Sequence, residues 1–93
     1  MEDLCRCITT RRFVMYGVSS CSHCQHQKQL LDAGFSHIVF HECDQECVQQ
    51  LDIKGYPTWI SFDSEGNKEL ARFVGVLRPD ELANITGCPY TSS

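Results

Sequence analysis

Short apolar runs separated by polar segments predict the elements of the first half of the chain. Residues 12–16 (RFVMY) and 37–40 (HIVF) are brief runs of β-forming residues and predict two strands. The polar stretch 21–33 between them ends at Gly34 and predicts a helix, and the serines at 19–20 are candidate cap residues. A connection of over twenty residues is long enough for a right-handed crossover, so we expect a parallel βαβ unit.

The second half of the chain predicts a hairpin between two helices. Residues 44–52 favour a short helix with its first residue, an aspartate, as the cap. The segment GYPTWISF predicts a third strand that starts just after Pro57, the turn-forming 63–67 (DSEGN) follows, and 68–74 predict an antiparallel fourth strand. Residues 79–87 start with Pro-Asp-Glu and predict a last helix. The order β-α-β-α-β-β-α predicts an α/β fold with a four-stranded mixed sheet flanked by helices.

Length, composition and charge limit the classes of protein. Ninety-three residues, 42% hydrophobic and 22% charged, make one globular domain at most. We expect it to span residues 12–87, with 1–11 as a flexible arm and 88–93 as a tail. The net charge of −4 and the scattered basic residues argue against a nucleic-acid partner. No apolar run approaches a membrane span or a signal peptide, so an intracellular location is the default expectation. We also expect a monomer.

Cysteine is the outlier of the composition, with seven residues. Six of them form close pairs, C-x-C, C-x-x-C and C-x-x-x-C; the positions are Cys5 and Cys7, Cys21 and Cys24, and Cys43 and Cys47. A structural framework usually links distant parts of a chain, so local pairs favour redox chemistry or metal binding. Cys88 is left over and is expected to be a free, spectator thiol.

The pair Cys21 and Cys24 lies where a strand ends and a helix begins. Free backbone N–H groups and the helix dipole stabilise a thiolate there, which predicts Cys21 as the nucleophile. Cys24, one turn further on, is placed to resolve the mixed disulfide, and His23 adds a stabilising charge when protonated. The alternatives at this stage are a zinc ligand pair and a static bridge.

These segments resemble the thioredoxin superfamily over roughly residues 12–87. Within it, CSHCQHQKQLL, then HECD with a following EC, then GYPTW resemble the thioredoxin-like domain fused to bacterial and plant vitamin K epoxide reductase homologues, typically C-P-H-C-x-x-Q-K. The resemblance implies a thioredoxin-like fold and disulfide exchange with a membrane quinone-linked partner, which a separate protein would supply here. It also implies a second cysteine pair at Cys43 and Cys47, and a cis Pro57 whose loop, with Tyr56, receives substrate.

Two departures from thioredoxin proper concern the direction of exchange. Met15 stands where thioredoxins hold a buried aspartate, so acid/base assistance of the reductase type is not expected. A histidine inside the motif, His23, is similar to that of oxidising members, which favours a thiol oxidant. Without the resemblance, Pro57 would only open an edge strand.

The roles of the other cysteine, histidine and tryptophan residues are less specific. Cys43 and Cys47 fit a small-loop disulfide, structural or relaying electrons, or two reduced thiols. Trp59 is expected in the core, and His26 and His41 receive no role. The function predicted is that of a thiol–disulfide oxidoreductase acting on cysteine-containing proteins without an organic cofactor or metal. The alternatives are a zinc-binding structural module built on the paired cysteines and a thioredoxin-like binding module without turnover.

Overall fold

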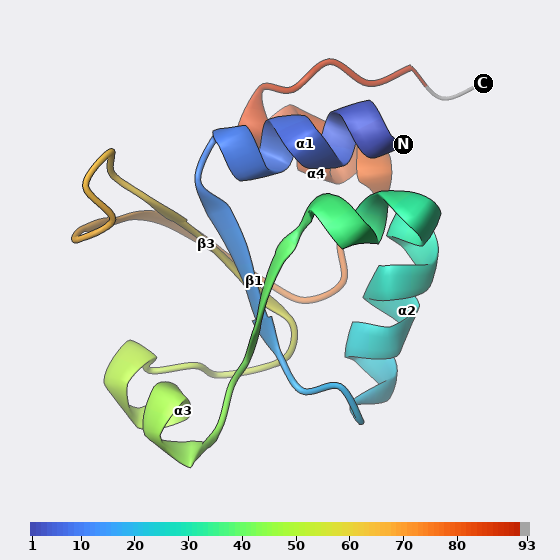
Figure 1. Ribbon diagram of the computed structural model, residues 1–93. Helices are drawn as coiled ribbons and strands as arrows, with labels where there is room; N and C mark the ends of the chain where they lie inside the picture. Colours follow the sequence, from blue (N-terminus) through green and yellow to red (C-terminus); the bar gives the residue numbers. More distant parts are fainter. Residues whose placement is uncertain (92–93) are drawn as a thin grey trace.

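A four-stranded mixed sheet forms the centre of the protein. The computed structural model describes residues 1–91, and its strands are β1 (Phe13–Gly17), β2 (Val39–Glu42), β3 (Thr58–Phe62) and β4 (Glu69–Val74). Their order in the sheet is β2-β1-β3-β4. β1 pairs parallel with β2, while β3 pairs antiparallel with both β1 and β4 (Figure 1). Pro57 therefore opens an internal strand and not an edge strand.

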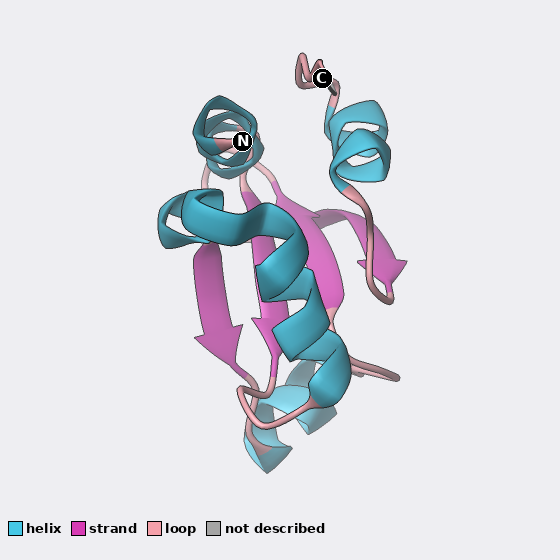
Figure 2. Cartoon of the chain, turned by 90° about the vertical axis from the view of Figure 1, so that its right-hand side faces the viewer, coloured by secondary structure: helices cyan, strands magenta, loops and turns pink. Residues whose placement is uncertain are grey.

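Helices lie against both faces of this sheet. They are α1 (Glu2–Thr10), α2 (Ser22–Leu31), α3 (Gln45–Leu51) and α4 (Pro79–Thr86), and a 3-10 helix, η1 (Asp32–His37), follows α2. Figure 2 shows α1, α2 and α4 over one face of the sheet and α3 near its lower end. The predicted order of elements from residue 12 onward is confirmed, as is the predicted fold class.

The boundaries of the βαβ unit differ from the prediction. α2 ends at Leu31, where Asp32 adopts a positive φ of 48°, and the chain continues as η1 and not as the end of a longer helix. The second strand starts at Val39, so the first residues of the predicted 37–40 strand belong to the turn before it. Gly34 is buried in η1. A larger residue does not fit at this position, because a Cβ would lie 2.8 Å from the Sγ of Cys5.

The predicted flexible arm at residues 1–11 is wrong, because this segment forms α1. Leu4, Cys5 and Ile8 lie on one face of that helix and are almost fully buried. They pack in the same hydrophobic cluster as residues of α2, β1 and α4. The few apolar residues of this mostly polar segment therefore contribute to the hydrophobic core. The domain starts near residue 2 and not at residue 12.

Cys88 is also not the free thiol that the sequence predicted. It forms a disulfide with Cys7 of α1, with a Cα–Cα distance of 5.9 Å and a sequence separation of 81. Cys88 is 5% exposed and belongs to the core, and Tyr90 packs against the same cluster, so the first part of the predicted 88–93 tail belongs to the domain. Residues 92–93 of that tail lie outside the described residues.

Alternating side chains of the strands divide the interior into two clusters. Phe13, Met15 and Trp59 face α1, α2 and α4, and Trp59 is fully buried, as predicted. Ile60, the neighbour of Trp59 in β3, points to the opposite face and packs with Cys43 and Cys47 at α3. This alternation follows from the two-residue period of a strand.

Candidate active site

The Cys21–Cys24 pair lies at the junction between β1 and α2. Cys21 is the N-cap of α2, with extended backbone angles (φ −75°, ψ 130°), and its carbonyl accepts the hydrogen bond of the Gln25 N–H at 3.0 Å. Cys24 therefore lies one turn into the helix. Cys21 is partly exposed and Cys24 is fully buried, and neither forms a disulfide.

The environment of Cys21 favours its thiolate. Hydrogen bonds from the backbone N–H groups of Cys24 and His23 to the sulfur lower the pKa of the Cys21 thiol. These N–H groups belong to the first turn of α2 and have no partner within the helix. The local sequence produces this arrangement because Cys21, with extended backbone angles, precedes the first helical residue, Ser22.

Cys24 has the opposite character. Burial raises the pKa of its thiol, and the hydrogen bond donated by the Val18 N–H, at 3.5 Å, opposes that effect in part. The neighbouring Cys21 and Glu42 also disfavour the Cys24 thiolate. A partly exposed thiol with a lowered pKa therefore lies beside a buried thiol with a raised pKa, which is the division between attacking and resolving cysteines in disulfide exchange.

Gly17 makes room for the buried thiol. A Cβ built on Gly17 would lie 2.6 Å from the Cys24 Sγ and 3.4 Å from Cε1 of Phe40. The carbonyl of Gly17 meanwhile accepts a hydrogen bond from the Cys43 N–H at 2.7 Å. Only a residue without a side chain fits between the helix and the end of this strand.

Tyr56 and Pro57 lie at the same end of the sheet. Tyr16 pairs with Thr58 in the register of β1 and β3, so the two residues that precede Thr58 lie beside the end of β1. The Tyr56–Pro57 peptide bond is cis, and the Pro57 carbonyl accepts a hydrogen bond from the Gly75 N–H at 2.8 Å. Tyr56 packs against the cluster that Cys21 and Cys24 share. The fold thus brings together segments that are over thirty residues apart.

The residues around the motif differ in part from the prediction. The His23 side chain is exposed and forms no hydrogen bond within residues 1–91, so its backbone N–H is what contacts the thiol. Neither Ser19 nor Ser20 caps α2 with its side chain. Ser19 binds Glu42 of β2 instead, through both its N–H and its hydroxyl group.

Cys43 and Cys47 form a disulfide, which was one of the two predicted alternatives, the other being two reduced thiols. Their Cα atoms are 5.2 Å apart, and the bridge closes the turn into α3, whose N-cap Asp44 accepts a hydrogen bond from the Cys47 N–H at 2.9 Å. Both cysteines are nearly buried and belong to the α3 cluster, not to the cluster of Cys21 and Cys24. The bridge therefore lies at α3, on the face of the sheet opposite α2.

Sequence reasoning missed the role of Gln27. This side chain of α2 is fully buried and faces the segment that precedes α4. Its amide group donates to the Leu77 carbonyl at 2.8 Å and accepts from the Leu77 N–H at 2.9 Å and from Trp59 Nε1 at 3.2 Å. The signal was its spacing: three residues after Cys24, it shares the inward face of α2.

Several other features bear on alternative functions. Among residues 1–91, no group of three or more His, Cys, Asp or Glu side chains is arranged to hold a metal ion. No helix in this part of the chain is long and apolar enough to cross a membrane. Cys5 is the third free thiol, and burial raises its pKa to about 11, which leaves Cys21 as the accessible one.

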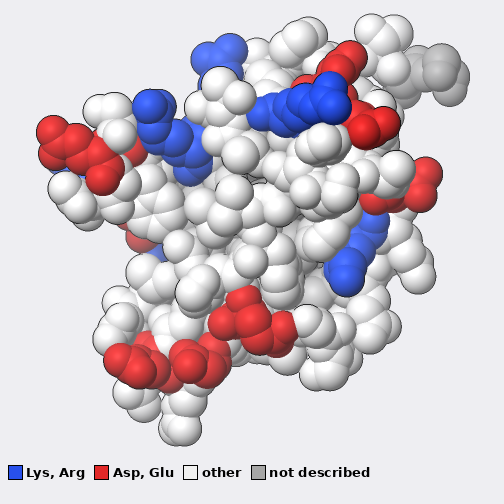
Figure 3. Space-filling model, in the orientation of Figure 1, with Lys and Arg blue, Asp and Glu red and all other residues white. Residues whose placement is uncertain are grey.

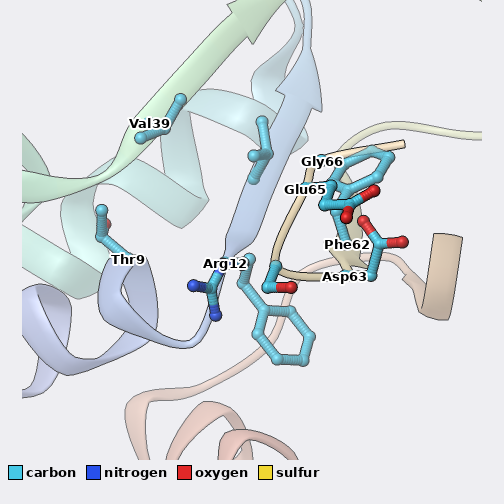
Figure 4. A pocket seen from close by; sticks show the side chains of 10 residues that line it. Thr9, Arg12, Val39, Phe62, Asp63, Glu65 and Gly66 are labelled. Atoms are coloured by element: carbon cyan, nitrogen blue, oxygen red, sulfur yellow. The ribbon is translucent and has the colours of Figure 1, made fainter. Parts of the chain in front are cut away.

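The surface charges and a hollow complete the description. Acidic side chains gather over α3 at the bottom of Figure 3. The stretch from Glu42 to Asp52 carries four acidic residues and no Lys or Arg. A hollow at the far end of β1 is lined by Thr9, Arg12, Val39, Phe62 and Asp63, among others (Figure 4), and contains no cysteine. It is therefore separate from the thiol pair.

Comparisons with known proteins agree with this architecture. The sequence matches no protein-family model. The fold is thioredoxin-like: the crystal structure of the germline-specific thioredoxin Deadhead (Thioredoxin-1) from Drosophila melanogaster superimposes with a TM-score of 0.60. The two chains are 17% identical, and the match covers 83% of this chain and 80% of that one. At this identity the likeness establishes the fold alone.

Proposed function

We propose that this protein is a thiol–disulfide oxidoreductase whose active site is Cys21-Ser22-His23-Cys24. The observation that carries the proposal is the contrast within the pair. Cys21 is the one accessible free thiol and has a lowered pKa, whereas Cys24 is buried behind it with a raised pKa. The thioredoxin-like fold supplies a scaffold that fits this chemistry, but the geometry of the two thiols is the specific argument.

In the reducing direction, exchange takes two steps. The Cys21 thiolate attacks one sulfur of a substrate disulfide, a Cys21–substrate disulfide forms, and the other substrate sulfur leaves as a thiolate that takes up a proton. Cys24 then loses its proton and attacks the Cys21 sulfur. This step breaks the mixed disulfide, releases the second substrate thiol and leaves a Cys21–Cys24 disulfide. In the oxidising direction, a substrate thiolate attacks that disulfide and the steps run in reverse.

The substrate we propose is a cysteine-containing protein that docks on the Tyr56–Pro57 loop. This loop lies beside the end of β1, and Tyr56 packs against the same hydrophobic cluster as Cys21. The chain needs no organic cofactor for this exchange, because the electrons stay on sulfur. By the resemblance to the domain fused to vitamin K epoxide reductase homologues, a separate membrane quinone-linked reductase is the proposed redox partner, and His23 within the motif favours the oxidising direction.

Trapping of the mixed disulfide tests the roles of the two cysteines. Cys24→Ser should accumulate a covalent adduct with a disulfide-containing protein substrate, because the resolving thiol is missing. Cys21→Ser should form none, while a Cys43→Ser/Cys47→Ser double variant, the control, should turn over like wild type. Adducts are read on non-reducing gels and by mass spectrometry. Undiminished exchange by Cys21→Ser would refute the assignment.

The direction of exchange is read from the reduction potential of the pair. Equilibration in glutathione buffers, with each cysteine pair quantified by alkylation and mass mapping, gives this value. A potential toward about −120 mV is expected for a thiol oxidant, and one toward about −270 mV would identify a reductant. The Cys43–Cys47 bridge, mapped in the same experiment, should stay oxidised throughout if it is structural and should titrate with Cys21–Cys24 if it relays electrons.

A further inference from the structure

Glu42, the last residue of β2, reaches the loop that leads into the active site. Its carboxylate accepts a hydrogen bond from the Ser19 N–H at 2.9 Å and another from the Ser19 hydroxyl. The Ser19 carbonyl in turn accepts a hydrogen bond from Nε2 of Gln25, at 3.2 Å. The loop between β1 and α2 is therefore anchored on one side by the neighbouring strand and on the other by the helix that carries both thiols.

The strand register places this carboxylate on the side of the sheet where Cys24 lies. Glu42 pairs with Gly17, and a Cβ built on Gly17 would lie 2.6 Å from the Cys24 sulfur. Glu42 and Phe40 are two residues apart in β2 and therefore point to the same face, and Phe40 packs against the cluster that contains Cys24. Ser19 is next to Val18, whose N–H donates to the Cys24 sulfur.

We propose that Glu42 is a positioning residue for the exchange reaction. It holds the Ser19 loop by two hydrogen bonds and so fixes the Val18 N–H against the Cys24 sulfur, with Cys21 at the end of the same loop. This inference rests on the proposed function and adds a residue to it. Positional errors of about 1 Å at a reacting centre cost up to about a hundredfold in rate, so the anchoring bears directly on turnover.

The charge of Glu42 provides a signature that a purely structural role lacks. The charged and titratable groups that face these residues are Cys21 and Glu42 beside Cys24, and Lys28 of α2 beside Glu42. The carboxylate helps to raise the pKa of the Cys24 thiol, so removing its charge should lower that pKa. Glu42 itself has a pKa below its usual range because of the two Ser19 hydrogen bonds, so it is ionised at neutral pH.

Reaction with an aromatic disulfide, dithiobis(nitrobenzoate), separates the two steps. Attack by Cys21 releases one nitrothiobenzoate, and attack by Cys24 on the resulting mixed disulfide releases a second. At a pH above the midpoint of each variant, where Cys24 is ionised in all of them, Glu42→Ala should slow the second release about tenfold. Glu42→Gln should retain most of that rate, because an amide can still bind Ser19, but should shift the pH midpoint of the second release downward. Ser19→Ala, which loses only the hydroxyl bond, should fall between wild type and Glu42→Ala.

The matched control is Glu46, an exposed acid in the first turn of α3 that contacts Gln50 and not the loop. Glu46→Ala and Glu46→Gln remove the same charge and should leave both releases unchanged. A second release in Glu42→Ala within twofold of that in Glu46→Ala would overturn the proposal. So would an unshifted pH midpoint in Glu42→Gln together with a normal rate in Ser19→Ala.

An independent readout separates this proposal from the proposed function. The amide proton of Ser19 should shift with pH as Glu42 titrates in wild type, and this shift should vanish in Glu42→Ala. If wild-type protein released no nitrothiobenzoate, the exchange function would fall, while the Ser19 titration would still show whether Glu42 holds the loop. An amide shift that does not follow the Glu42 carboxyl group would refute the anchoring itself.

Discussion

Replacing Gln27 with methionine tests the packing that supports α2, the helix that carries Cys24 and has Cys21 as its N-cap. The Gln27 amide makes three hydrogen bonds, two with the backbone of Leu77 and one with the indole of Trp59. These join α2 to a segment 50 residues away in sequence and to the central strand β3. Methionine has a similar volume and a similar helix propensity, so Gln27→Met removes the polar contacts with little change of shape.

The magnitude follows from the groups left without partners. Gln27 is fully buried, and so is Trp59, whereas Leu77 is only half-buried and its backbone can bind water in part. A buried group left unsatisfied costs about 1–3 kcal/mol, and the buried thioether regains part of this through its apolar surface. We expect a net loss of about 2–4 kcal/mol from the free energy of unfolding, out of about 5–14 kcal/mol for a domain of this length.

Urea unfolding followed by far-UV circular dichroism, with identical redox conditions for every variant, measures this loss. A fall in the melting temperature of roughly 8–32 °C should accompany it, at about 4–8 °C per kcal/mol for a domain of this size. Gln29→Met is the matched control, because Gln29 is exposed on the same helix and should change stability by less than about 0.5 kcal/mol. A Gln27→Met variant as stable as Gln29→Met would refute the reasoning that these hydrogen bonds hold α2 in place.

Two further predictions concern the other cysteines and the reactive thiol. Because a disulfide stabilises more when it closes a longer loop, Cys7→Ala/Cys88→Ala should lose about 4–5 kcal/mol of unfolding free energy. Cys43→Ala/Cys47→Ala should lose only about 2 kcal/mol. Equal losses in urea unfolding would contradict the loop-length argument. The lowered pKa of the Cys21 thiol predicts that its alkylation rate by iodoacetamide reaches half its maximum at a lower pH than that of a cysteine in an unfolded peptide. A midpoint at or above the peptide value would contradict the stabilisation by the α2 backbone.

The position of the C-x-x-C motif at the start of a helix was predictable from the sequence, whereas the contacts around it were not. The spacing of Cys21 and Cys24 after a short β-forming run predicted two thiols at the start of a helix, and the structure has them there. The helix cap was assigned to the adjacent serines because local rules favour a hydroxyl at that position. In the folded protein, Ser19 binds Glu42 from the next parallel strand instead, a partner that appears only once β1 and β2 are paired.

The N-terminal helix shows the limit of local reasoning in another way. Its apolar positions are few and lie among charged and polar residues, so the segment looks like a solvated arm when it is considered alone. Leu4 and Ile8 become core residues because α2, α4 and the sheet present an apolar surface for them to cover. The pairing of Cys7 with Cys88 depends on the same packing, since nothing in the spacing of the cysteines links positions 81 residues apart.

Local sequence signals were enough to predict the strands, the helices that connect them and the position of the Cys21–Cys24 pair. Hydrophobic periodicity, turn residues and the C-x-x-C spacing are local signals, and each acts over a few neighbouring residues. The bridged cysteine pairs and the contacts of Glu42 and Gln27 at α2 and the loop before it depend on the packing of the whole chain. Those contacts join residues that are 23 and 50 positions apart, and burial and hydrogen-bond partners at such separations arise from packing, which no local pattern encodes.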